Sequence, residues 1–274
     1  MDVRQATAAD LDAVVDLAGI VDPPSEGTDV DRDYYANIIE HGRLVVAEAS
    51  GIVIGYSGAI PAGDLRHLAD LFVHPDAHGR GVGRELLDAV WDEPVTLVPR
   101  QTFSSIHPSA LPLYVRAGMQ PQWPLLYVEG DPASVADTYL TVRDLDADEA
   151  ADVERVWLGW DRIDQYRYWA ARPGGRTFAV IEAETPVAVG CLSRSRSRYT
   201  LLHLAVVDRT LMTHALSAAA TLATDSMLLA VAGPSHGVRF LVDAGWQVRE
   251  HDIYCASEPD LVDPHRLIPH PGLL

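Results

Sequence analysis

Lysine is absent from the sequence, so its 21 basic residues are all arginine, and they stand against 39 acidic residues. The formal net charge of −18 would repel a polyanion, which argues against nucleic acid as a partner and favours a cationic substrate. An alternative is that the acidity serves only solubility, and that the missing lysines reflect codon bias in a GC-rich genome.

Cysteine is scarce, and long apolar runs are missing. Cys191 and Cys255 lie in apolar segments without the spacing of metal ligands, which predicts buried reduced thiols rather than a disulfide framework or a metal site. No run approaches the roughly 18 apolar residues of a membrane span, and the first residues lack a basic stretch followed by an apolar core. We therefore expect a soluble, cytoplasmic protein without a membrane partner.

The sequence does contain a weak internal repeat. Three pairs of segments resemble each other in the same order along the chain: 43–59 with 177–194, 114–120 with 241–247, and 3–14 with 142–153. Repetition in the same order indicates a duplicated domain. We place the first copy at 1–133, the second copy at 138–258, and an extended, proline-containing tail at 259–274.

Each copy has the mixed order of strands and helices that is typical of an α/β fold. In the first copy, apolar periodicity and turn residues predict two hairpin strands, later strands and intervening helices. The strands are expected at 44–49, 52–60, 67–73, 95–98 and 125–129, and the later helices at 84–91 and 109–117. Because the second copy repeats this order, we expect two similar mixed sheets in tandem.

Three glycines within five residues stand out in HPDAHGRGVG (74–83), after a predicted strand that ends at Val73. The first turn of a helix presents unpaired N–H groups, and glycine lets the backbone approach a phosphate closely. Arg80 and Arg84 add positive charge to an otherwise acidic protein. The segment therefore predicts a phosphate site, with a tight turn that binds nothing as the alternative.

Two motifs of the first copy carry a family resemblance. LADLFVHPDAHGRGVGRELL (68–87) resembles the acetyl-CoA signature of the GCN5-related N-acetyltransferases (GNAT), and SALPLYVRAGM (109–119) is similar to the later LYxxxGF helix motif of that family. The resemblance covers about 1–133 and reaches the second copy only through the internal repeat. It implies two tandem acyl-CoA N-acyltransferase folds, of which the second is degenerate.

Carried over residue by residue, the resemblance implies acetyl-CoA as the cofactor. The backbone of Leu71, Phe72 and Val73 would hydrogen-bond the pantetheine arm like an added strand. The pyrophosphate would be held by the N–H groups of His78, Gly79, Arg80, Gly81, Val82, Gly83 and Arg84. The sequence departs from the family at His78, which replaces the usual Arg or Gln, and at His107, which stands where Asn often precedes the helix.

Acetyl transfer to an amine requires a proton acceptor for the ammonium and a proton donor for the departing sulfur. The resemblance places Tyr114 at the position of the general acid, although a core aromatic is the alternative. Asp70 and Glu48 are the candidate bases. Asp70 could instead brace the loop through Arg80 or Arg84, and Glu48 could be structural, because the second copy repeats it.

The second copy lacks the features that the chemistry needs. Its segment 206–217 contains no glycine, and Leu241 aligns with Tyr114. We therefore expect this copy not to bind acetyl-CoA, and either to close one wall of the substrate site or to form the surface of a homodimer. Its aromatic cluster could be ordinary core or a platform for a substrate, and comprises Trp157, Trp160, Tyr166, Tyr168 and Trp169.

Together these features predict an acetyl-CoA-dependent N-acetyltransferase that acts on a primary amine of a small, cationic molecule by direct transfer in a ternary complex. An alternative is a non-catalytic acyl-CoA-binding protein with a regulatory or scaffold role. A third interpretation, a protein acetyltransferase, would need a groove that is open to peptides.

Overall fold

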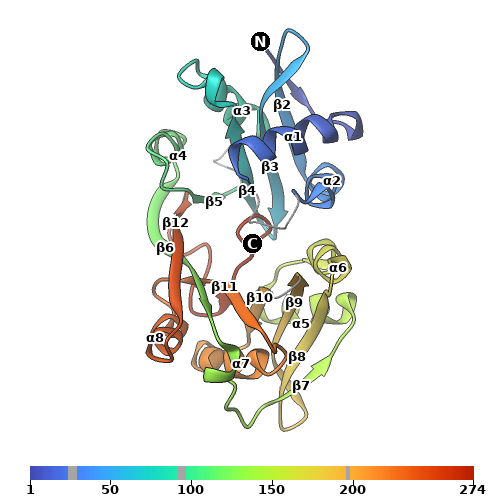
Figure 1. The fold of residues 1–274 in the computed structure, drawn as a ribbon, viewed down its shortest axis with the longest axis vertical. Helices are drawn as coiled ribbons and strands as arrows, with labels where there is room; N and C mark the ends of the chain where they lie inside the picture. The colour runs from blue at the N-terminus through green and yellow to red at the C-terminus, as the bar shows by residue number, and fades with distance from the viewer. Residues whose placement is uncertain (24–29, 92–96, 196–197) are drawn as a thin grey trace.

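The computed structural model describes residues 1–23, 30–91, 97–195 and 198–274 (Figure 1). The first half of the chain contains a strand, two helices, three strands, and then alternating helices and strands. These elements are β1 (Asp2–Gln5), α1 (Leu11–Val21), α2 (Arg32–His41), β2 (Arg43–Ala49), β3 (Ile52–Ala62), β4 (Leu65–Val73), α3 (Val82–Val90), β5 (Arg100–Ser104), α4 (Ala110–Arg116) and β6 (Gln120–Gly130).

The second half repeats this order. It consists of β7 (Thr141–Asp144), α5 (Ala147–Leu158), α6 (Ile163–Ala171), β8 (Arg176–Glu182), β9 (Thr185–Ser195), β10 (Arg198–Val206), α7 (Met212–Ala220), β11 (Ser226–Ala232), α8 (His236–Asp243) and β12 (Gln247–Ala256). The tail adds the short strand β13 (Leu267–Ile268), which pairs with β10. The mixed α/β fold class and the tandem repeat predicted from the sequence are thereby confirmed.

One prediction of the element positions is wrong. Leu97 and Val98 lie in a turn, and β5 begins only at Arg100, whereas residues 95 and 96 fall outside the described residues. The apolar residues of 95–98 resemble a strand in composition, but β5 forms where its backbone meets β4 on one side and β12 on the other.

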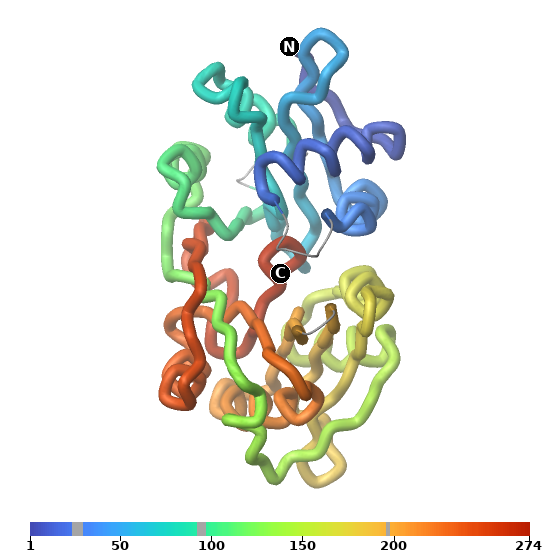
Figure 2. Tube along the Cα trace, in the orientation of Figure 1, coloured from blue at the N-terminus to red at the C-terminus, as the bar shows by residue number. Residues whose placement is uncertain are grey.

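The two halves share one continuous sheet, in the order β1-β2-β3-β4-β5-β12-β6-β11-β10-β9-β8-β7. The last strand of each half is inserted into the other half: β12 lies between β5 and β6, and β6 lies between β12 and β11 (Figure 2). Because each half supplies a strand to the other, separating the halves would break the hydrogen-bond ladders of both strands.

Burial on the two faces of the sheet fixes the orientation of the side chains. One core cluster joins both halves, with Val14 of α1, Tyr56 of β3 and Trp169 of α6 among its members. A second cluster lies on the other face of the first half, where Leu86 of α3 and Tyr114 of α4 pack together. The strands β3 and β4 therefore separate the side of α1 and α2 from the side of α3 and α4.

The described helices are all too short or too polar to cross a membrane. Cys191 and Cys255 are both buried free thiols, as their apolar contexts predict. Within the described ranges, His, Cys, Asp and Glu side chains form no group that could hold a metal ion.

Candidate active site

A gap in pairing between β4 and β5 defines the candidate site. The two strands pair in parallel only where Arg66, His67 and Leu68 oppose Arg100–Thr102. Beyond Leu68, β4 continues to Val73 and pairs with β3 alone among the described strands. One edge of the predicted pantetheine segment, which contains Leu71, Phe72 and Val73, is therefore left for an extended ligand to pair with.

A β-bulge marks the point where β4 and β5 separate. Gly58 of β3 pairs with Asp70, and Ala59 pairs with Leu68, so Ala69 has no partner in the register. A bulge bends its strand and changes the direction of nearby side chains. The carboxyl group of Asp70 consequently faces the tyrosines of α2 and β3, and the Ser57 hydroxyl donates to the backbone oxygen of Asp70 over 2.9 Å.

The glycine loop lies directly after this strand. Gly79 and Gly81 have φ angles of 72° and 86°, in the left-handed region that favours glycine, and Gly81 caps the N-terminus of α3. A β-carbon at either position would have no atom within 4 Å. The turn is therefore set by backbone conformation and is not crowded by protein atoms.

Several amides of this loop are available to a ligand. The His78 amide donates to the Pro75 carbonyl over 3.2 Å, and the Arg84 amide to the Gly81 carbonyl over 3.1 Å. The amides from Gly79 to Gly83 have no acceptor in the part of the chain that the structure describes. Converging donors at the start of a helix fit a diphosphate, so the residues present are compatible with acetyl-CoA.

His78 holds the loop against the end of β4. Its Nε2–H donates to the Val73 carbonyl over 2.8 Å, and its ring centroid lies 6.0 Å from that of His107. The two departures from the family pattern therefore lie side by side. The imidazole of His78 braces the backbone and supplies no permanent charge.

Asp70 lies among tyrosines on the side of α1 and α2. The group comprises Tyr34 and Tyr35 of α2, Tyr56 of β3 and Tyr168 of α6, all of whose phenols are affected by the charge of Asp70. The hydroxyls of Tyr35 and Tyr56 are 3.0 Å apart. Burial raises the pKa of Asp70 to about 7, the negative charge of Asp22 adds to this shift, and the Tyr34 hydroxyl opposes it.

The bracing role that the sequence left open for Asp70 finds no support in these contacts. In the described chain Asp70 forms no ion pair with Arg80 or Arg84, and Arg84 lies 3.7 Å from Asp88 instead. Asp70 Oδ2 is buried without a hydrogen-bond partner among the described residues. A carboxylate oxygen in this state can accept a proton from a ligand.

Tyr114 projects from α4 into the core on the opposite side, and its side chain is buried against that of Leu86 and its neighbours. Burial raises the pKa of the Tyr114 phenol well above its ordinary value, and the charge of Asp70 raises it further. The phenol therefore stays protonated at neutral pH. Tyr114 and Asp70 approach β4 from opposite faces.

Glu48, the other candidate base, lies apart from Asp70 and the tyrosines. Its carboxylate accepts from Arg4 over 3.0 Å, and Arg4 also pairs with Asp10 at 2.7 Å. Glu48 pairs with Val53 in the β2–β3 register, whereas Asp70 pairs with Gly58 further along β3. This placement favours the structural alternative for Glu48.

The equivalent centre of the second half is filled by protein. Buried Glu154 accepts from Tyr166 over 2.7 Å, and its Oε2 is 2.8 Å from His203 Nε2. Arg162, which is 1 % exposed, places its Nε 3.2 Å from Glu154 Oε1. Burial lowers the pKa of His203, while His203 and Arg162 outweigh burial and hold the pKa of Glu154 below its usual range.

The aromatic residues of the second half divide between fully buried side chains and partly buried ones packed against the same core, the latter being Trp157, Trp160 and Tyr168. Trp169 stacks on His203 at 4.8 Å, and Tyr166 is also fully buried, so these two are core. Tyr168 faces α2 instead, with its ring 6.4 Å from that of Tyr34. Trp160 lies against the Arg162 guanidinium at 4.7 Å.

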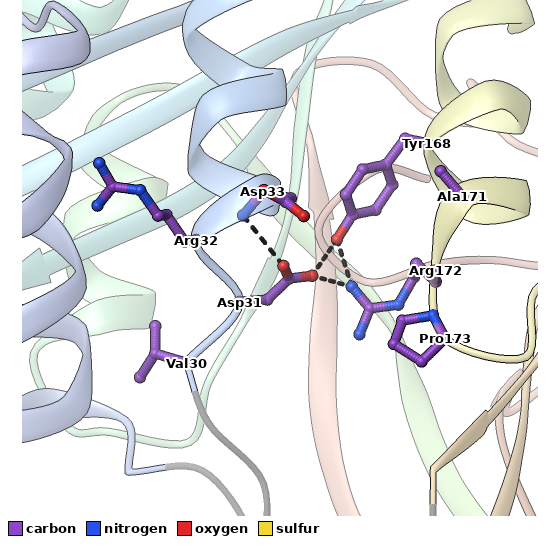
Figure 3. Close-up of a pocket in the computed structure, with 8 residues that line it drawn as sticks. All are labelled: Val30, Asp31, Arg32, Asp33, Tyr168, Ala171, Arg172 and Pro173. Carbon is purple, nitrogen blue, oxygen red and sulfur yellow. Dashed lines mark hydrogen bonds and ion pairs between the residues drawn. The ribbon is translucent and has the colours of Figure 1, made fainter.

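A cavity of about 300 Å³ lies between α2 and α6 (Figure 3). Asp31 binds both Tyr168 and Arg172 across the two halves, and its other oxygen accepts from the Asp33 amide over 3.1 Å. No pattern in the sequence indicates this cavity, because its residues come from segments far apart in the chain. Tyr168 connects the cavity to the tyrosines around Asp70.

Comparison with known proteins assigns the fold. Residues 40–120 match the family model of the acetyltransferase (GNAT) domain. A search of the curated proteins found no match to this chain.

Solved structures resemble the chain over nearly its full length. A protein from Pyrococcus horikoshii that has been proposed to be an acetyltransferase superposes with a TM-score of 0.74 and 13% identity, covering 100% of this chain and 94% of its own. A tandem GNAT protein from the clavulanic acid biosynthesis pathway gives 0.62 and 14%, covering 96% and 99%. A GCN5-related N-acetyltransferase from Anabaena variabilis gives 0.64 and 13%, covering 93% and 72%.

At these identities the structural likeness establishes the fold, and the match over 40–120 identifies the domain. Both agree with the free strand edge and the glycine loop of the first half. Residues 40–120 therefore match a GNAT acetyltransferase domain, and the fold of the whole chain is similar to that of proteins that carry two GNAT folds in tandem.

Proposed function

We propose that the first half is an acetyl-CoA-dependent N-acetyltransferase that acetylates a primary amine of a small, cationic molecule. The observation that carries this proposal is the position of three features along one strand. Among the described residues, β4 has a free edge after Leu68 and the Gly79–Gly83 amides that follow it have no acceptor, while Asp70 and Tyr114 flank the strand from opposite faces.

Acetyl-CoA would supply an acetyl group activated as a thioester. The Gly79–Gly83 amides would hold its diphosphate, and the main chain of Leu71–Val73 would pair with its pantetheine arm. This places the acyl group near the bulge at Ala69. In this proposal His78 positions the loop, and Arg80 and Arg84 add charge at its rim.

Asp70 is the proposed base. An amine arrives as its ammonium, and Asp70 takes one proton to leave a neutral nitrogen with a free electron pair. That nitrogen forms the new C–N bond as the C–S bond breaks. A pKa near 7 is suited to this task, since the carboxylate is then both available and basic at neutral pH.

Tyr114 is the proposed acid. Its phenol is protonated at neutral pH, so it can give a proton to the departing thiolate. The second proton lost by the amine nitrogen restores the phenol, and the net products are an amide, a thiol and one proton. The tyrosines around Asp70 provide aromatic faces and hydroxyls that would attract a cationic acceptor.

The test is direct. Calorimetric titration with acetyl-CoA should show binding, and thiol release should be measured with n-butylamine, phenethylamine and spermidine as acceptors. Tight binding without thiol release from any amine would instead support a non-catalytic acyl-CoA-binding protein.

A further inference from the structure

The last residues of the chain run back from the second half to the first (Figure 1). We call Pro269–Leu274 the strap. It follows β13, which is paired to β10, and it ends with Leu273 and Leu274 fully buried in the core cluster that joins the halves. The strap is therefore anchored in the second half and packed against the first.

The strap contacts the first half at two places near Asp70, one in β4 and one in α2. Buried His67, which precedes Asp70 in β4, donates its Nε2–H to the Pro271 carbonyl over 2.8 Å. Burial lowers the pKa of His67 to about 4, so this hydrogen bond belongs to the neutral ring. Gly272 packs against Tyr34, the residue of α2 whose hydroxyl influences the ionisation of Asp70.

The contact at Gly272 leaves no room for a side chain. A β-carbon there would lie 2.2 Å from Tyr34 Oη, and 2.9 and 3.0 Å from two ring carbons. The Tyr34 ring is itself confined by Tyr35, at 5.1 Å between centroids, and by Tyr168, at 6.4 Å. Space alone therefore requires glycine here, and any larger residue must displace Tyr34 or the strap.

The contact between Gly272 and Tyr34 lies on the same face of β4 as Asp70. Tyr114 belongs to the cluster under α3 and α4, whereas Asp70 faces the side of α1 and α2. If Tyr114 serves the leaving group and Asp70 the amine, the acceptor must enter from the side of Asp70. The strap and Tyr34 lie on that side.

We propose that the strap forms a wall of the acceptor site, and that Gly272, through Tyr34, determines which amines reach Asp70. The second half then contributes a specificity-determining residue to the site of the first half, although its own centre is filled. This inference rests on the proposed acetyltransferase function.

Gly272→Ala tests the proposal, with Glu258→Ala as a control at an exposed position of the same C-terminal segment. For the amine that the unaltered protein uses best, we expect Gly272→Ala to lower kcat/KM by about 10- to 100-fold and to change the ranking of n-butylamine, phenethylamine and spermidine. The Kd for acetyl-CoA should stay within about twofold, since the diphosphate loop lies elsewhere. Glu258→Ala should change none of these values.

Tyr34→Phe provides the second arm of the experiment. It removes the oxygen that the new methyl group would meet first and leaves the ring in place. The loss caused by Gly272→Ala should therefore be smaller in the Tyr34→Phe background, which is the non-additivity expected for two groups in contact. If Gly272→Ala does not fold, Tyr34→Ala replaces it, because it opens the same wall and should shift the preference towards phenethylamine.

One readout does not depend on turnover. The Asp70 carboxyl can be titrated by carbon NMR, and Gly272→Ala should shift its apparent pKa while Glu258→Ala should not. The titratable groups that interact electrostatically with Asp70 are Asp22, Tyr34, Tyr35, Tyr56 and Tyr168, together with Tyr114 on the opposite face of β4. Absence of thiol release in the unaltered protein would refute the proposed function. A folded Gly272→Ala protein with unchanged amine ranking and unchanged Asp70 titration would refute the role of the strap.

Discussion

Asp70 and His203 occupy the same position in the two halves of the sheet. Each directly follows the residue that a β-bulge leaves unpaired, Ala69 in β4 and Leu202 in β10. Asp70 has a buried oxygen without a partner among the described residues, whereas His203 is tied to Glu154 at 2.8 Å. One backbone arrangement therefore carries an available carboxylate in the first half and a closed network in the second.

Tyr114→Phe should lower turnover by about 10²-fold, because the phenol is the proposed proton donor and proton transfer is typically worth about 10² to 10⁴ in rate. The ring is retained, so packing under α3 should be preserved. Thiol release would be compared with calorimetric binding of acetyl-CoA. Unchanged turnover in this variant would exclude Tyr114 as the acid.

Asp70 should impose a pH dependence on catalysis. Because the carboxylate must be ionised to accept a proton, kcat/KM should fall as the pH drops below about 7. Asp70→Asn should abolish this limb together with most of the activity. A pH–rate profile from pH 5 to 9 measures both, and a profile without an acid limb near 7 would contradict the assignment.

The Asp70 carboxyl should also make folding stability depend on pH, in the direction opposite to that of a salt-bridged carboxylate. The folded-state pKa of Asp70 lies above its ordinary value of 3.8, so the contribution of this one group to stability falls as the pH rises from about 4 to about 7. Asp70→Asn avoids this loss. We expect its Tm to exceed that of the unaltered protein by a few degrees at pH 8 and to match it at pH 4, as followed by circular dichroism.

Gly81→Ala should weaken acetyl-CoA binding by about tenfold. The φ angle of 86° at Gly81 is costly for alanine, and relaxing it would turn the free amides of the loop away from the ligand. Gly51→Ala is a matched control, because Gly51 has a φ of 80° and equally open surroundings but lies in the β2–β3 turn. Both variants should lose similar stability, and only the first should bind more weakly.

The second half should contribute stability without a second cofactor site. Calorimetry should give one acetyl-CoA bound per chain, since the centre around His203 is filled. Glu154→Ala leaves Arg162, whose side chain is only 1 % exposed, without its ion-pair partner. This should cost about 3 to 5 kcal/mol of unfolding free energy. Urea unfolding measures this cost, and a binding stoichiometry near two would contradict the interpretation.

Much of the first half could be predicted from local sequence. The turn-forming glycines, the N-terminal start of α3 and the hairpin of β2 and β3 depend on short segments, and the structure places each of these elements within a few residues of its predicted bounds. Leu97 and Val98 are different, because their apolar character suits a strand but the pairing partners of β5 lie further along the chain. Pairing between distant strands leaves no local pattern.

The surroundings of Asp70 could not be predicted for the same reason. Tyr34 and Tyr56 are separated from it in sequence, and Tyr168 and Gly272 come from the other half. Locally the sequence shows only that Tyr34 and Tyr35 are adjacent. It does not reveal that both side chains point towards β4.

Local sequence was sufficient to predict the repeated α/β order, the glycine turn before α3 and the loss of that turn in the second copy, because each depends on the conformational preferences of neighbouring residues. The exchange of β6 and β12, the enclosure of Asp70 by tyrosines and the contact of the strap with the first half became visible only in the folded structure. These features depend on burial and on contacts between distant segments, which exist only once the chain has folded.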